Sequence, residues 1–169
     1  MKHVFVDAYN VINSWDKLKR IKEYSLEASR QKLLDIINNY ASYNQYLVYV
    51  VFDAHQIDGR ENIDKINKNL IVVFTKEGET ADSFIERHVN NIGRKIEVLV
   101  VTSDLLEQQL IFQRGATRMS SLEFFNEVKN IEKNIERNIE KQNVNKGNKL
   151  HDMLEEDLLE KLEKIRRSR

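Results

Sequence analysis

Short apolar runs alternate with longer amphipathic stretches along the first 120 residues of the chain. The apolar runs that are rich in β-branched and aromatic residues are 4–6, 46–53, 70–74 and 96–101. Runs of this kind predict strands that are buried on both faces, as in a parallel sheet. Apolar residues at helical spacing occur between them, over residues 11–22, 26–43, 81–92 and 104–113. The alternation predicts an α/β fold with helices on both faces of a parallel sheet.

Polar residues and glycines mark where several of these elements begin and end. Ser25 and Thr80 stand at N-cap positions before two of the predicted helices, and Gly93 follows the second as a C-cap. Residues 115–119 predict a short edge strand, and residues 55–69 predict a loop with weak helical character. We therefore expect one domain over residues 1–120.

The pattern after this domain is helical only. Ser120 and Glu123 have the spacing of a capping box, and an amphipathic helix follows them. Residues 142–149 are polar and contain a glycine, which predicts a break before a last helix over residues 150–165. We expect this C-terminal helical extension, residues 121–169, to pack on the same domain.

Composition narrows the classes of protein that remain. The 27 basic and 27 acidic residues cancel, so any binding of nucleic acid depends on a local patch. The absence of cysteine excludes disulfides and thiolate metal sites, and the four histidines have no zinc-type spacing. No apolar run approaches the roughly 18 residues of a membrane span, and no signal-peptide region is found. We expect a cytoplasmic protein with no membrane partner.

Acidic residues follow the predicted strands. Asp7, Asp53 and Asp104 come after the first, second and fourth strands, and Asp82 stands in the first turn of the helix after the third. Because the carboxyl ends of parallel strands lie at one edge of the sheet, these carboxylates are expected to converge. Mutual repulsion of close carboxylates is relieved by a hard cation such as Mg²⁺ or Mn²⁺. One or two such ions suit the hydrolysis of phosphodiester bonds.

Each acid also has a structural explanation when it is taken alone. Asp82 and Asp104 fit helix N-termini, and Asp53 fits the start of a loop. Asp7 is explained least easily in this way, because it ends the first strand, which we expect to be central. Asn10 either orients Asp7, contacts a sugar or phosphate, or caps the next helix.

Four stretches taken together resemble the YacP-like NYN-domain family: residues 6–10, 51–55, 74–82 and 102–118. The resemblance covers nearly the whole chain. It implies a PIN-like fold and a bacterial endoribonuclease, in a family with at least one member that associates with ribosomes and cuts mRNA during translation.

The resemblance also implies roles for individual residues. Asp7, Asp82 and Asp104 match the metal-binding acids, and Asn10 matches the asparagine of the NYN signature. Asp53 and Glu79 are second-rank candidates for the same acidic pocket.

Basic and aromatic residues near these motifs are candidates for RNA binding. Tyr9 is a candidate for stacking a base, and Trp15 is expected in the core. The basic candidates for contacting RNA phosphates are Arg114, Arg118, Lys17, Lys19 and Arg20. The last three equally fit an ordinary solvated helix face.

The sequence thus predicts a metal-dependent endoribonuclease that hydrolyses RNA, in particular mRNA on the ribosome. It does not determine the oligomeric state, for which a monomer is favoured. The main alternative is a non-catalytic RNA- or ribosome-binding module on the same scaffold. Phosphatases and phospho-receiver domains fit less well. The haloacid-dehalogenase-type phosphatase motif needs an aspartate where Tyr9 stands, and a receiver domain needs paired acids at the end of the first strand.

Overall fold

A central sheet organises the computed structural model, which describes residues 1–54, 61–103 and 115–168. Within these residues the sheet has six strands in the order β3-β4-β2-β1-β5-β6. The strands are β1 (His3–Asp7), β2 (Leu47–Phe52), β3 (Asn62–Lys65), β4 (Leu70–Phe74), β5 (Val98–Val101) and β6 (Thr117–Met119). All neighbouring strands are parallel except β3 and β4. β1 lies in the interior of the sheet as predicted, and β6 is an edge strand as predicted.

The antiparallel strand β3 corrects the prediction of a wholly parallel sheet and of a loop over residues 55–69. All four residues of β3 are exposed, and three of them are polar, so the apolar pattern that signals a buried strand is missing. This segment joins the sheet by pairing with β4 at a polar edge, and not by burial of apolar side chains. Residues 55–60 of the predicted loop lie outside the described residues.

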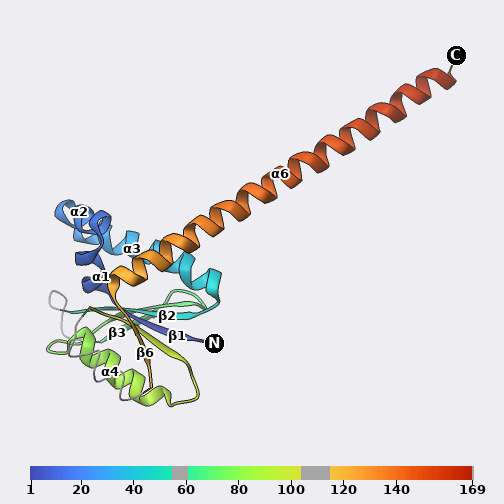
Figure 1. The fold of residues 1–169 in the computed structure, drawn as a ribbon. Coiled ribbons are helices and arrows are strands. Elements are labelled where there is room, and N and C mark those ends of the chain that lie inside the picture. The colour runs from blue at the N-terminus through green and yellow to red at the C-terminus, as the bar shows by residue number, and fades with distance from the viewer. Residues whose placement is uncertain (55–60, 104–114, 169) are drawn as a thin grey trace. The chain divides into compact units, whose positions relative to one another are not determined.

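Helices lie on both faces of the sheet. They are α1 (Ala8–Ser14), α2 (Asp16–Tyr24), α3 (Leu26–Asn44), α4 (Ala81–Ile92) and α6 (Ser121–Arg167). Figure 1 shows α1, α2 and α3 on one face of the sheet and α4 on the other. The helix predicted over residues 104–113 lies outside the described residues.

The predicted helix ends are confirmed by their hydrogen bonds. The Ser25 hydroxyl accepts a bond from the Ala28 N–H at 3.1 Å, and the Thr80 hydroxyl accepts one from the Ser83 N–H at 3.2 Å. Gly93 is the C-cap of α4 and has a φ of 78°, a conformation that glycine adopts without strain. These local signals therefore set the bounds of α3 and α4.

One helix predicted over residues 11–22 is two helices in the structure, α1 and α2. The backbone of Trp15 is extended between them, with φ −89° and ψ 117°. Its side chain is buried as predicted, its indole N–H donates to the Ser121 carbonyl at 2.9 Å, and its ring lies 5.7 Å from that of Phe124. Burial of this ring against α6 accompanies the interruption of the helix.

Alternation along the strands divides the core into two layers. Phe5, Val51 and Val73 pack in one cluster with Phe84 and Ile85 of α4. The intervening strand residues point to the opposite face, on which α1 and α3 lie. A residue at the end of a strand thus contacts the helices that cover its own face of the sheet.

The chain divides into two compact units, Met1–Ile131 and Glu132–Arg169. The first turns of α6 belong to the first unit, where Phe124, Val128 and Ile131 are buried. The boundary therefore falls after residue 131 rather than residue 120. Packing of the rest of the extension on the domain stays a prediction.

The helix α6 runs without interruption from Ser121 to Arg167, so the break predicted over residues 142–149 is wrong. A single glycine in a helix lowers stability by only about 1 kcal/mol relative to alanine, and the segments on either side, residues 132–141 and 150–165, are rich in the good helix formers Glu, Lys and Leu. The predicted capping box is confirmed: Glu123 accepts from the Ser120 N–H at 2.7 Å, and the Ser120 hydroxyl accepts from the Glu123 N–H at 3.2 Å. None of the helices in the described part of the chain is long and apolar enough to cross a membrane.

Candidate active site

The carboxyl ends of the parallel strands bring three of the predicted acids to the same edge of the sheet. Asp7 pairs in register with Val51, and Asp53 lies two residues further along that chain segment. Asp7 follows Phe5 by two positions, as Asp53 follows Val51, so both acids lie on the face covered by α4. Asp82 stands in the first turn of α4. Asp7, Asp53 and Asp82 are thus brought to one edge and one face of the sheet.

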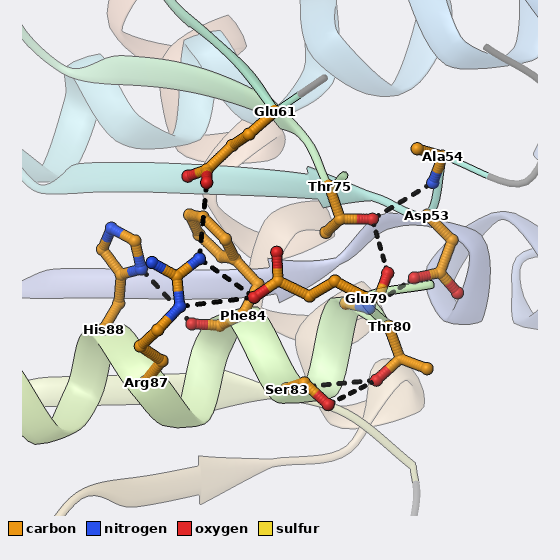
Figure 2. Close-up of polar contacts among 11 residues, drawn as sticks. Asp53, Ala54, Glu61, Thr75, Glu79, Thr80, Ser83, Phe84, Arg87 and His88 are labelled. Carbon is orange, nitrogen blue, oxygen red and sulfur yellow. Dashed lines mark hydrogen bonds and ion pairs between the residues drawn. The ribbon is translucent and has the colours of Figure 1, made fainter. Parts of the chain in front are cut away.

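The start of α4 is tied to the end of β2 by Asp53. Its Oδ1 accepts a hydrogen bond from the backbone N–H of Ala81, the first residue of the helix (Figure 2). A carboxylate at this place also interacts favourably with the positive end of the helix dipole. Asp53 and the Thr80 cap together hold the turn that carries Asp82.

Thr75 forms a second link between the strand ends and the segment before α4. Its hydroxyl accepts from the Ala54 N–H at 3.1 Å and donates to the Glu79 carbonyl at 2.7 Å (Figure 2). Thr75 is fully buried, so this link is shielded from water. The loop from β4 to α4 is therefore fixed at both of its ends.

The carboxylate of Glu79 is oriented by Arg87 of α4. Glu79 Oε1 lies 2.9 Å from Arg87 Nη2 and 3.3 Å from Nε, and Glu61 Oε2 lies 3.5 Å from the same Nη2. The hydrogen bond that Arg87 donates to the Glu79 carboxylate raises the pKa of Arg87. Within the described residues, the buried Oε2 of Glu79 has no hydrogen-bond partner. One oxygen of Glu79 therefore serves an ion pair, and the other remains open for a further donor or cation.

Asp7 begins a polar network that joins α1 to α6. Its Oδ1 accepts from the Asn10 N–H at 3.3 Å, so Asp7 is the N-cap of α1. The Ser121 hydroxyl donates to Asn10 Oδ1, and the Ser103 hydroxyl lies 3.2 Å from that of Ser121. Ser103 directly precedes Asp104, which lies outside the described residues. Asn10 is thus bonded to Asp7 through its backbone and oriented through its side chain.

Ser121 is a site residue that the sequence analysis missed. Its side chain is completely buried, and its hydroxyl connects two residues that are otherwise far apart in the chain. In the sequence it looks like any serine beside a capping box. Its contact with Asn10 depends on the packing of the first turn of α6 against α1.

The residue types at this edge are those that bind a hard divalent cation. The carboxylates of Asp7 and Asp82 supply oxygen, the ligand type that Mg²⁺ and Mn²⁺ prefer, and Glu79 in the segment before α4 has one further carboxylate oxygen without a hydrogen-bond partner among the described residues. In residues 1–54, 61–103 and 115–168, no three His, Asp or Glu residues lie close enough together to form a metal site. Asp104, the third predicted ligand, is not among these residues.

The predicted RNA-binding residues have different surroundings. Lys17, Lys19 and Arg20 of α2 are exposed, as are several of their neighbours on this helix. Arg118 is partly buried in β6, and its Nε has no hydrogen-bond partner among the described residues. It pairs with Val100 and so lies on the face that α4 covers. Arg114 lies outside the described residues.

Tyr9 has a partner that the sequence did not predict, Arg30 of α3. Arg30 Nε donates to the Tyr9 hydroxyl at 3.0 Å, and Nη2 donates to the same oxygen. The Tyr9 ring also lies edge-on to Phe52, with centroids 5.5 Å apart. Arg30 carries no local signal in the sequence, because it is one of several charged residues in the first half of its helix, beside Glu27 and Lys32.

The sequence matches the YacP-like NYN domain family over residues 4–167. It is 44% identical over 135 residues to the protein YacP of Bacillus subtilis (strain 168), covering 78% of each chain. The fold is similar to the crystal structure of Rae1 (YacP) from Bacillus subtilis, with TM-score 0.74 and 39% identity over 99% of this chain and 95% of that one. A mutant of Rae1 gives TM-score 0.72 and 40% identity over 83% of each chain. NYN domains are PIN-like and are generally nucleases. The chain therefore belongs to the YacP-like NYN domain family.

Proposed function

We propose that this protein is a metal-dependent endoribonuclease whose substrate is mRNA on the translating ribosome. The observation that carries the proposal is the position of Asp7 and Asp82 at the carboxyl edge of the sheet, on the face that α4 covers, in a chain that belongs to an NYN family. A cation bound between carboxylates at this edge would offset their mutual repulsion. The choice of mRNA and of the ribosome rests on the resemblance to the family.

Asp7, Asp82 and Asp104 are the residues that would hold Mg²⁺ or Mn²⁺. When bound, such an ion supplies activation of water and stabilisation of charge on the phosphate. The residues around the acids keep them in place. Asn10 donates its backbone N–H to Asp7, and Asp53 holds the first turn of α4 through Ala81.

Asp53 and Glu79 are assigned to positioning. The carboxylate of Asp53 already accepts from Ala81, and one oxygen of Glu79 is paired with Arg87. Both contacts fix the segment that presents Asp82. Substitution of either residue is expected to lower activity less than substitution of Asp7.

The basic candidates extend the site toward the RNA backbone. Lys17, Lys19 and Arg20 project from α2 into solvent, where they are available to phosphates. Each phosphate contact adds to the salt dependence of binding to a single strand, with a slope of about −0.7 per neutralised phosphate. Replacing all three by alanine is therefore expected to weaken binding at low salt and to flatten its salt dependence.

The test is cleavage of a translated mRNA in a reconstituted translation reaction with Mg²⁺. Wild type is compared with Asp7→Asn and with a matched control, Asp35→Asn, which removes an exposed acid from the middle of α3. Melting curves check that each variant is folded. Discrete cuts that wild type and Asp35→Asn make and folded Asp7→Asn does not make would support the proposal.

Identical cleavage by wild type and Asp7→Asn would overturn the acidic site as the catalytic one. No cleavage by any of the three, together with retained binding to ribosomes, would favour the non-catalytic binding module instead. Calorimetric titration of the isolated protein with Mn²⁺, with binding by wild type and none by folded Asp7→Asn, provides an independent arm, because removing Mg²⁺ from the cleavage reaction would also stop translation.

A further inference from the structure

The Arg30 guanidinium is nearly buried at the edge of the sheet where the acids lie. Only 14% of its side chain is exposed. Its carbon Cζ lies 5.7 Å from the ring centre of Phe52 and 6.0 Å from that of Phe74, the last residues of β2 and β4. Arg30 therefore lies beside the ends of two strands at the carboxyl edge, where ligands of open α/β sheets bind.

The anionic partner of Arg30 is weak. Among the described residues, the ion pair that Arg30 forms is with Glu27, at 3.7 Å from Nη1, and the Glu27 side chain is 84% exposed. Exposed pairs of this kind contribute little. Burying a guanidinium without a strong counter-charge is unfavourable, and the neutral hydroxyl of Tyr9 with the aromatic rings offsets only part of the lost hydration. The Arg30 guanidinium therefore lacks a strong counter-charge among the described residues.

Tyr9 fixes the orientation of the Arg30 guanidinium. Because Nε and Nη2 both donate to the Tyr9 hydroxyl, the planar group is held by one side, and Nη1 faces away from that hydroxyl. Tyr9 is two residues after Asp7 and lies in the first turn of α1. The same turn thus carries the predicted metal ligand and the residue that orients Arg30.

The two groups lie on opposite faces of the edge. By strand alternation Asp7 and Asp53 lie on the face covered by α4, whereas Phe52 and Phe74 lie on the face of α3, from which Arg30 projects. A single strand of RNA that crosses the edge could therefore contact the acids with one part of its backbone and Arg30 with another.

We propose that Arg30, oriented by Tyr9, binds a phosphate of the RNA backbone next to the one that is cut. Arginine is suited to this function because its planar fork forms two parallel hydrogen bonds to phosphate oxygens. The proposal rests on the proposed function for the identity of the ligand. It concerns binding, so it can be tested separately from cleavage.

The experiment measures binding of a fluorescent single-stranded RNA to the full-length protein over a series of KCl concentrations. All proteins carry Asp7→Asn, which removes cleavage under the proposed function. Arg30→Met keeps the aliphatic bulk and removes the charge. Arg94→Met is the matched control, because Arg94 is exposed and follows the C-terminal end of α4, away from the carboxyl edge. Arg30→Lys keeps the charge and loses the fork.

Arg30→Met is expected to bind RNA about 10- to 100-fold more weakly, the range for a lost hydrogen bond to a charged group. Its salt slope is expected to fall by about 0.7, the value for one phosphate on a single strand. Arg30→Lys is expected to keep the slope and lose several-fold in affinity, and Arg94→Met to match its parent. Inorganic phosphate is expected to compete more weakly with RNA on Arg30→Met than on the parent.

An Arg30→Met protein that is folded and binds RNA with the affinity and slope of its parent would overturn the proposal, and would leave Arg30 as a structural link between α3 and α1. If Arg30→Met does not fold, unchanged affinity in Arg30→Lys has the same meaning. A failure of the proposed function has a separate signature. In that case wild type cuts no RNA, whether or not the Arg30 substitutions change RNA binding. Loss of binding in Arg30→Met without cleavage by wild type supports the phosphate site within a non-catalytic module.

Discussion

The position of Asp53 allows its contribution to stability to be separated from a contribution to catalysis. Its carboxylate accepts from the Ala81 N–H at the first turn of α4, and Ala81 is only 2% exposed, so water cannot replace the lost acceptor. A hydrogen bond to a charged acceptor contributes about 1.5–3 kcal/mol. The negative charge near a helix N-terminus adds about 0.3–1 kcal/mol. Asp53→Ala is therefore expected to lower the free energy of unfolding by about 2–4 kcal/mol.

The conservative variant gives the control. Asp53→Asn keeps an oxygen that can accept from Ala81 and loses only the charge, so its expected loss is about 1 kcal/mol or less. Urea unfolding followed by circular dichroism measures both variants. In the cleavage assay, folded Asp53→Asn is expected to keep activity within roughly tenfold of wild type, an energy of about 1.4 kcal/mol, whereas Asp7→Asn is expected to lose it.

Two results would refute the reasoning about Asp53. An Asp53→Ala protein that unfolds at the same urea concentration as wild type would show that the bond to Ala81 does not stabilise α4. An Asp53→Asn protein of normal stability that loses cleavage as completely as Asp7→Asn would make Asp53 a member of the acidic site rather than a positioning residue.

Three further predictions follow from other parts of the structure. Tyr40→Phe is expected to lower the free energy of unfolding by about 1.5–3 kcal/mol in urea titrations, because the buried Tyr40 hydroxyl donates to Glu127 at 2.7 Å; the same midpoint as wild type would contradict this. Burial lowers the pKa of His3 below 6.5, so the unfolded chain takes up a proton there more readily, and stability is lost as the pH falls below 6.5. In urea titrations at pH 7.5 and 5.5, His3→Gln should lose less stability than wild type on acidification, and an equal loss would argue against the effect. Gly147→Ala is expected to raise helix content at 222 nm and helix stability by about 1 kcal/mol, because the site is open and helical; no gain would favour a break there.

The amino-acid sequence by itself determined the features that depend on local pattern. Buried strands show as continuous apolar runs, so β1, β2, β4 and β5 were predicted, and their acids were placed at one edge because parallel strands end together. Caps also depend on neighbours a few residues away, and Ser25, Thr80 and Gly93 were therefore identified. The function class followed from the acids and from the resemblance of their flanking motifs to one family.

Other features were decided by contacts between distant residues. The edge strand β3 has no apolar alternation and exists through its pairing with β4. The error over residues 142–149 was of a different kind, because the helical propensity of the flanking segments is a local property that outweighed one glycine. The bond from Ser121 to Asn10 joins residues 111 positions apart, and Arg30 meets Tyr9 across 21. Such partners are set by how helices pack on the sheet, because burial forces each polar group to find a nearby partner in space rather than in sequence.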